Sequence, residues 1–321
     1  MKKPIDIVEK VMINGIEQKI HVIGTNINNP LILFIHGGPG VVNRHNVLKY
    51  MSGITDKVTI VGWDQRGTGG SYKGAKKEDM NVDTFVEDAR ELTEYLCKRF
   101  NKVKIYIQGH SWGSCVGTLL AYKYPENIKA YFGQGQLVNG IKNEEMSYDY
   151  VMEKAKAAGD EKDVQKLLEI KRPVKGLYVN NPIKDLTAQR QLLNKYGGAA
   201  VKCSSMWKST ISPILFSSEY TLSDIIGVLK GYSFSLKHMW EEVIKLDFAK
   251  DCTKFSVPVF YLIGSSDYNT PFELSYEYYN SIEAPMKDYI WFKESAHSPL
   301  AEEPDKFGKT LVEKIELIEA M

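Results

Sequence analysis

Residues 102–117 read KVKIYIQGHSWGSCVG, a stretch that indicates the fold class of the chain. Val103, Ile105 and Ile107 alternate with other residue types at the two-residue period of a β-strand. The strand runs into Gly-His-Ser-Trp-Gly, a G-x-S-x-G sequence with its serine at position 111. Glycines at both ends let a strand turn sharply into a helix, which leaves the Ser111 hydroxyl exposed above the sheet. The alternative is a chance match in an ordinary turn, but the preceding strand favours a nucleophile elbow.

The composition of the chain is that of a soluble globular protein. Of its 321 residues 43% are hydrophobic and 25% are charged, and the formal net charge is +1. A charge so near zero gives no reason to expect a nucleic-acid or membrane partner. No signal region follows the two N-terminal lysines, and no apolar run approaches a membrane span. The length suits one large α/β domain with an insertion, or two domains.

The cysteines carry no C-x-x-C pair and no zinc spacing. They stand at Cys97, Cys115, Cys203 and Cys252. Such scattered thiols fit a reducing cytoplasm better than a disulfide framework. Because no ligand cluster is visible either, we expect no metal and no other cofactor.

Strands and helices alternate through the first part of the chain, which predicts a parallel sheet covered by helices. Short apolar runs predict buried strands, and Asn14-Gly15 predicts the turn of an opening hairpin. Thr84 and Glu87 fit a capping box at the start of a helix. We predict a hairpin over 5–22 and strands over 31–35, 58–62 and 128–132, in addition to the strand before the elbow. We predict helices over 84–100 and from the elbow to about residue 124.

From about residue 138 the pattern turns mostly helical, and strands return at 257–264 and 289–292. A last helix carries apolar residues on one face, namely Phe307, Leu311, Ile315 and Ile318. We therefore predict an α/β core in two parts, 1–137 and 249–321, with a helical cap over 138–248. An independent helical domain is the less favoured alternative, since the core pattern resumes after it.

A serine becomes a nucleophile only when a base takes its proton, and an acid orients that base. After an elbow serine, the acid and then the histidine follow in chain order. Asp267 comes just past a predicted strand, and His297 lies between the last strand and the last helix. Strand ends of this kind open onto a common rim, so we predict that Ser111, Asp267 and His297 form a triad. Asp288 is the weaker alternative acid because it precedes its strand.

A tetrahedral intermediate also needs hydrogen-bond donors for its oxyanion. The main-chain N–H of Trp112, the residue after the serine, is one candidate. Gly38, in the His-Gly-Gly-Pro-Gly sequence at 36–40, is the second, because a glycine turn can approach a substrate closely. The alternative for this sequence is a tight turn without a catalytic part.

Three motifs together resemble the prolyl-iminopeptidase branch of the α/β-hydrolases. They are HGGPG at 36–40, WDQRGTGGS at 63–71 and GHSWGS at 109–114, each after a predicted strand. The resemblance extends to Asp267 and His297, so it covers the core on both sides of the cap. The resemblance implies the same triad and the same oxyanion donors. It also implies that Asp64 and Arg66 are structural residues, in a buried or rim ion pair that braces the nearby loop.

The cap is where substrate choice is expected to arise. Family members that release N-terminal proline hold the free amine with cap carboxylates, but the glutamate-bearing aromatic motif of that role is missing here. Glutamates of the cap that could take this role include Glu144, Glu145, Glu219, Glu241 and Glu242. Trp207, Phe234 and Trp240 could line an apolar pocket or pack the cap itself. We take Trp207, Trp240 and Glu241 as candidate substrate contacts.

These patterns predict a cytoplasmic serine hydrolase that cleaves a small amide or ester through an acyl-enzyme. Release of N-terminal proline from a short peptide is the leading activity that the resemblance implies. A carboxylesterase or lactonase acting on a small apolar substrate is the alternative. A catalytically silent binding module is the alternative of another class. The sequence does not determine the oligomeric state.

Overall fold

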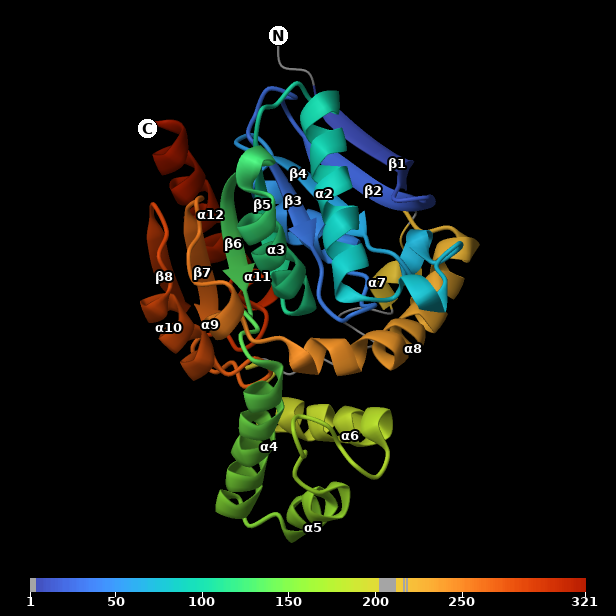
Figure 1. Cartoon of the computed structure of the whole chain (residues 1–321), viewed down its shortest axis with the longest axis vertical. Coiled ribbons are helices and arrows are strands. Elements are labelled where there is room, and N and C mark those ends of the chain that lie inside the picture. Colours follow the sequence, from blue (N-terminus) through green and yellow to red (C-terminus); the bar gives the residue numbers. More distant parts are fainter. Residues whose placement is uncertain (1–3, 202–211, 216, 218) are drawn as a thin grey trace.

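The computed structural model of the chain describes residues 4–201, 212–215, 217 and 219–321. Its strands are β1 (Ile5–Ile13), β2 (Ile16–Gly24), β3 (Leu31–Ile35), β4 (Thr59–Asp64), β5 (Ile105–His110), β6 (Ile128–Gln134), β7 (Val259–Gly264) and β8 (Lys287–Phe292). In the described residues they form one eight-stranded sheet in the order β1-β2-β4-β3-β5-β6-β7-β8 (Figure 1). The β1–β2 and β2–β4 pairs are antiparallel and the other neighbours are parallel, which confirms the predicted fold class.

The predicted opening hairpin is present. Asn14 and Gly15 connect β1 to β2 with φ values of 44° and 80°. Two consecutive residues at positive φ match the twist of the flanking strands, and asparagine followed by glycine tolerates this conformation best. The turn sets the register in which Ile13 faces Ile16.

Helices cover both faces of the sheet because its central strands are apolar on both sides. All five residues of β3 are buried. Leu33 packs in the cluster that holds α2 (Val82–Arg99) and α3 (Trp112–Lys123), whereas Phe34 packs in the cluster that holds α1 (Arg44–Met51) and α12 (Pro304–Glu319). The four apolar residues predicted to share one face of the last helix are all buried on α12.

The predicted capping box of α2 is wrong. The helix begins at Val82, and the side chain of its N-cap Asn81 accepts a hydrogen bond from the main-chain N of Thr84. Asparagine and threonine both cap helices well, so the sequence offers two starts within one turn. Glu87 instead bonds with the hydroxyl of Tyr124.

Helices of the insertion between β6 and β7 lie at one end of the sheet, where the first three project away from it and the last long one lies against the core (Figure 1). The helices of the insertion are α4 (Gly140–Ala157), α5 (Glu161–Ile170), α6 (Pro182–Lys195), α7 (Ser212–Leu215) and α8 (Leu222–Lys245). The helices that follow in the core are α9 (Phe248–Asp251), α10 (Phe272–Ser281) and α11 (Pro299–Glu302). The chain leaves and re-enters the core side by side: Gly140 N lies 3.0 Å from Leu246 O, and Phe248 N lies 2.8 Å from Val138 O. The division at 137/138 and 248/249 stays a prediction.

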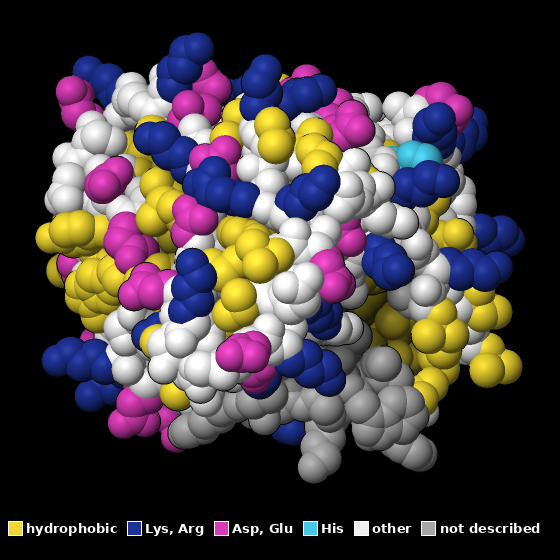
Figure 2. All heavy atoms as spheres, turned by 90° about the horizontal axis from the view of Figure 1, so that it is seen from below, with side chains coloured by type: hydrophobic (Ala, Val, Ile, Leu, Met, Phe, Trp, Pro, Cys, Tyr) yellow, Lys and Arg dark blue, Asp and Glu magenta, His cyan; other side chains and the backbone are white. Residues whose placement is uncertain are grey.

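The surface at the cap end carries mixed charge. Figure 2 shows Lys and Arg side chains interspersed with Asp and Glu over the face seen from below. In the part of the chain that the structure describes, no helix is both long and apolar enough to cross a bilayer.

Candidate active site

Ser111 occupies a sharp turn between β5 and α3. Its φ and ψ are 55° and −119°, a conformation that residues other than glycine rarely adopt. A Cβ on Gly113 would lie 2.0 Å from the main-chain O of Ile35, and one on Gly109 would lie 2.4 Å from the O of Gly113. Gly113 therefore lets the helix pass close to β3, and Gly109 lets the end of β5 pass close to the helix. The strand, turn and helix predicted around Ser111 are present.

Asp267 and His297 lie in the loops that follow β7 and β8, and their side chains meet. Nδ1 of His297 is 3.0 Å from Oδ2 and 3.2 Å from Oδ1 of Asp267. The buried carboxylate also accepts hydrogen bonds from the main-chain N of Asn269 at 2.9 Å and of Thr270 at 3.0 Å. The hydroxyl of Thr270 donates to Oδ2 at 2.9 Å. These donors hold the carboxylate toward the imidazole ring.

Two residues at the ends of β5 and β6 lie close to the His297 ring. The ring of His110, which precedes Ser111, lies 4.9 Å from that of His297. Gly135 follows β6 with a φ of 51°, and a Cβ there would lie 2.8 Å from Cε1 of His297. Ser111, Asp267 and His297 thus all lie past the carboxyl ends of parallel strands of one sheet, β5, β7 and β8.

The glycine turn after β3 also approaches the elbow. A Cβ on Gly37 would lie 3.1 Å from Cβ of Ser111. Gly38 has a φ of 125°, and a side chain there would meet the main-chain N of Gly40 at 2.4 Å. Within the described residues, the main-chain N–H groups of Gly38 and Trp112 donate to no acceptor. Both amides are therefore free to bind an anionic oxygen.

Gln65, which sequence reasoning missed, braces this turn against the elbow. Its side-chain amide donates to the main-chain O of His36 at 2.7 Å, and its Oε1 accepts from Nε1 of Trp112 at 3.0 Å. The main-chain N of Gln65 donates to Nε2 of His36 at 3.1 Å. Burial lowers the pKa of His36, which keeps the ring neutral and able to accept this bond. The only sequence signal was the position of Gln65 inside the WDQRG motif.

Asp64 and Arg66 are buried as predicted, but they pair with other residues rather than with each other. Oδ1 of Asp64 lies 3.2 Å from Nε of Arg44. Arg66 binds Asp88 with two contacts of 2.7 and 2.8 Å. Each charge is thus neutralised locally, and the pairs join the loop after β4 to α1 and α2.

Asp288, the alternative acid, lies at the beginning of β8, away from the carboxyl end of the strand. It pairs with Lys314 at 2.7 Å. This position leaves it no contact with His297 among the bonds of the described residues.

Two of the three cap residues chosen from the sequence, Trp240 and Glu241, lie within the described residues. Trp207 lies outside the described residues. Trp240 is buried within the main apolar cluster, an environment that favours the packing alternative. The side chain of Glu241 is exposed on α8. The two described candidates thus differ, with Trp240 buried and Glu241 exposed.

Glu144 differs from the other cap glutamates. It is only 1% exposed, and Oε1 pairs with Arg190. Oε2 is buried and receives no hydrogen bond from the described part of the chain. Its neighbour Asn143 donates to the main-chain O of Asn269, two residues past Asp267. A buried acceptor without a donor is costly, so this oxygen marks a place for a ligand or a water.

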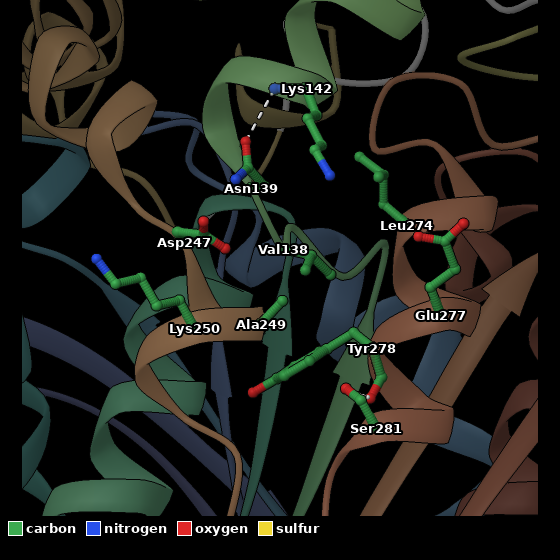
Figure 3. Close-up of a pocket in the computed structure, with 10 residues that line it drawn as sticks. All are labelled: Val138, Asn139, Lys142, Asp247, Ala249, Lys250, Leu274, Glu277, Tyr278 and Ser281. Atoms are coloured by element: carbon green, nitrogen blue, oxygen red, sulfur yellow. Dashed lines mark hydrogen bonds between the residues drawn. The ribbon is translucent and has the colours of Figure 1, made fainter.

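A separate cavity of about 390 Å³ lies where the cap joins the core (Figure 3). Its walls come from both connecting segments and from α9 and α10, and include Asn139, Asp247 and Tyr278. None of the three predicted triad residues lines it. In the described residues, no group of three or more His, Cys, Asp or Glu could hold a metal ion.

Known proteins resemble this chain in sequence and in fold. Residues 30–304 match the family model described as the alpha/beta hydrolase fold. The probable aminopeptidase YbaC of Bacillus subtilis strain 168 is 30% identical over 311 residues, which cover 97% of this chain and 96% of the relative. A proline iminopeptidase-related protein of Thermus thermophilus has a TM-score of 0.67 at 16% identity, with 99% and 100% of the two chains covered. An esterase of Exiguobacterium antarcticum has a TM-score of 0.60 at 16% identity, with 97% and 100% covered. At these identities the two structures show a shared fold alone.

Proposed function

Because this chain belongs to the α/β-hydrolase family, in its prolyl-iminopeptidase-like branch, we propose that it is a serine hydrolase that works through an acyl-enzyme. One observation carries the proposal: a serine held at positive φ on the elbow follows His110, whose ring lies 4.9 Å from an imidazole with its Nδ1 3.0 Å from a buried carboxylate. In this proposal Ser111 is the nucleophile, His297 the base and Asp267 the orienting acid.

The reaction follows from these roles. The hydroxyl oxygen of Ser111 attacks the carbonyl carbon while Nε2 of His297 takes its proton. Asp267 accepts a hydrogen bond from Nδ1 and stabilises the imidazolium. The main-chain N–H groups of Gly38 and Trp112 donate to the oxyanion. His297 then protonates the leaving amine or alcohol, and a water hydrolyses the acyl-enzyme by the same route.

For substrate class, the proposal is an aminopeptidase that releases proline or another small apolar residue from the N-terminus of a short peptide. A full-length relative that is named a probable aminopeptidase supports this choice. The buried, unpartnered Oε2 of Glu144 supports it as well, because a substrate ammonium would supply the missing donor.

The proposed location is a reducing cytoplasm. The three cysteines that the structure describes, Cys97, Cys115 and Cys252, are buried free thiols. Free thiols of this kind persist where the surroundings keep them reduced, which supports the proposed location.

A carboxylesterase is the second candidate, and the shared fold with a solved esterase supports it. Proline β-naphthylamide and short p-nitrophenyl esters separate the two activities. Turnover of the naphthylamide is the expected result, and turnover of the esters alone would remove the aminopeptidase assignment.

Labelling by a fluorophosphonate tests the hydrolase proposal itself. The wild-type chain should be labelled and the Ser111→Ala variant should not. A wild-type chain that resists labelling and turns over neither substrate would favour a silent binding module.

A further inference from the structure

Residues 198–201, which follow α6 of the cap, contact both loops of the proposed triad. The main-chain O of Gly198 accepts a hydrogen bond from Tyr268 N at 2.9 Å. The main-chain O of Ala199 accepts one from His297 N at 3.2 Å. The cap therefore binds the backbone of the base itself and of the residue that follows the acid.

Glycines make this close approach possible. Gly197, at a φ of 79°, ends α6, and the main-chain N of Gly198 returns to Leu193 O at 3.0 Å. A Cβ on Gly198 would lie 2.8 Å from the Tyr150 ring and 3.1 Å from Cβ of Tyr268. Since those rings stack with centroids 3.9 Å apart, they leave no room for a side chain.

One carboxylate joins segment 198–201 to the loop of the base. Oε1 of Glu302, at the end of α11, accepts from the main-chain N of Val201 at 2.6 Å. Oε2 of the same residue accepts from the main-chain N of Ala296 at 2.8 Å. Ala296 is fully buried and directly precedes His297. Glu302 thus bonds the cap with one oxygen and the base loop with the other.

We propose that Glu302 is a positioning residue that couples the seating of the cap to the placement of His297. This proposal rests on the proposed function. A backbone N–H taken from water needs an acceptor, and bonds to an ionised carboxylate are the stronger kind. When segment 198–201 leaves its place, His297 N loses its acceptor and the Glu302 carboxylate loses the donor from Val201. Asp267 and His110 still contact His297, but its loop has lost its bonds to the cap. The base is then placed less accurately, so catalysis is fastest while segment 198–201 is seated.

Glu303 supplies a matched control in the same loop. Its Oε2 accepts from Glu294 N at 3.1 Å and from the Ser295 hydroxyl at 2.7 Å. Both partners belong to the loop that carries His297, and neither belongs to the cap. A change at Glu303 therefore perturbs the loop without touching the link to segment 198–201.

The test uses full-length Glu302→Ala, Glu302→Gln and Glu303→Gln. We expect labelling of Ser111 by a fluorophosphonate to slow by about tenfold in Glu302→Ala, because a small displacement of a base has large kinetic effects. Glu302→Gln should recover part of the rate, since its single side-chain oxygen can still accept the main-chain bond from Val201 or the one from Ala296. If the alanine variant does not fold, the labelling rate of Glu302→Gln is compared with that of the wild type instead.

Backbone hydrogen exchange distinguishes the proposed coupling from a purely local role of Glu302, because a local role would not change exchange rates in the cap. Backbone exchange should rise together at 198–201 and at 295–298 in the Glu302 variants, and only at 293–298 in Glu303→Gln. Wild-type labelling rates in both Glu302 variants, or faster exchange confined to the loop of the base, would overturn the coupling. Failure of the wild-type chain to label would instead count against the proposed function, and the exchange measurement would still test the coupling.

Discussion

Nε2 of His110 lies 3.0 Å from the main-chain oxygen of His297, and the two imidazole rings lie 4.9 Å apart. His110 directly precedes Ser111, so the residue beside the proposed nucleophile contacts the proposed base. Burial, with a smaller contribution from the charge of His297, lowers the pKa of His110 to about 3. A neutral His110 donates its Nε2–H to the carbonyl of His297 and places no second positive charge beside it.

Removing this donor should impair catalysis. We expect kcat to fall about tenfold in His110→Leu with KM little changed, since the ring of His297 loses its alignment. His110→Gln should recover most of the rate, because its side-chain amide can place a donor near the position of Nε2. Steady-state kinetics on a p-nitrophenyl ester measures both. An unimpaired leucine variant would show that the contact has no part in placing the base.

Gly135 should tolerate no side chain. Its φ is 51° and a Cβ there would come within 2.8 Å of His297, so Gly135→Ala should displace the ring and lower kcat by about a hundredfold. Gly159 is the control, because it has a φ of 66° and nothing within 4 Å of its Cβ position. Gly159→Ala should cost about 1 kcal/mol of stability from backbone strain and leave kcat unchanged. Equal kcat values for the two variants would contradict the contact with His297.

Glu144→Gln tests whether the cap carboxylate binds an amine. We expect KM for proline β-naphthylamide to rise about tenfold or more, since a charge-assisted bond to the ammonium is lost. Turnover of an ester without a free amine should not change. Glu145→Gln is the control, because Glu145 lies 3.6 Å from Arg172 in a partly exposed pair. A loss that is equal for amine and ester substrates would assign Glu144 a structural role only.

Acidification should destabilise the fold through His45. Burial lowers the pKa of His45 from 6.5 to about 4, so the unfolded chain binds this proton more readily than the folded chain. The contribution of neutral His45 to the free energy of unfolding is fully present above pH 6.5. It is lost as the pH falls toward 4, by up to about 1.4 kcal/mol per pH unit for one proton. Melting temperatures between pH 7 and 4 should fall more steeply for the wild type than for His45→Gln. Parallel curves for the two proteins would rule this contribution out.

Local patterns were enough to predict much of the fold. The hairpin at Asn14-Gly15, the elbow around Ser111 and the apolar face of α12 depend on turn chemistry and periodicity within a few residues. The same local reasoning misplaced the cap of α2, because Asn81 and Thr84 both fit the N-cap position. Boundaries are decided by which of two similar local bonds forms in the folded chain.

The sequence alone predicted the order of strands and helices, because periodicity and turn chemistry are local properties. It also placed the candidate residue types at the strand ends. Three roles emerged only from the packed molecule: Gln65 braces the glycine turn, Glu144 is the buried cap glutamate, and Glu302 joins the cap to the base loop. The bond from Glu302 to Val201 spans about a hundred positions of the chain. In the sequence each of these residues looks like any other glutamine or glutamate, because burial and hydrogen-bond partners exist only once distant segments have packed together.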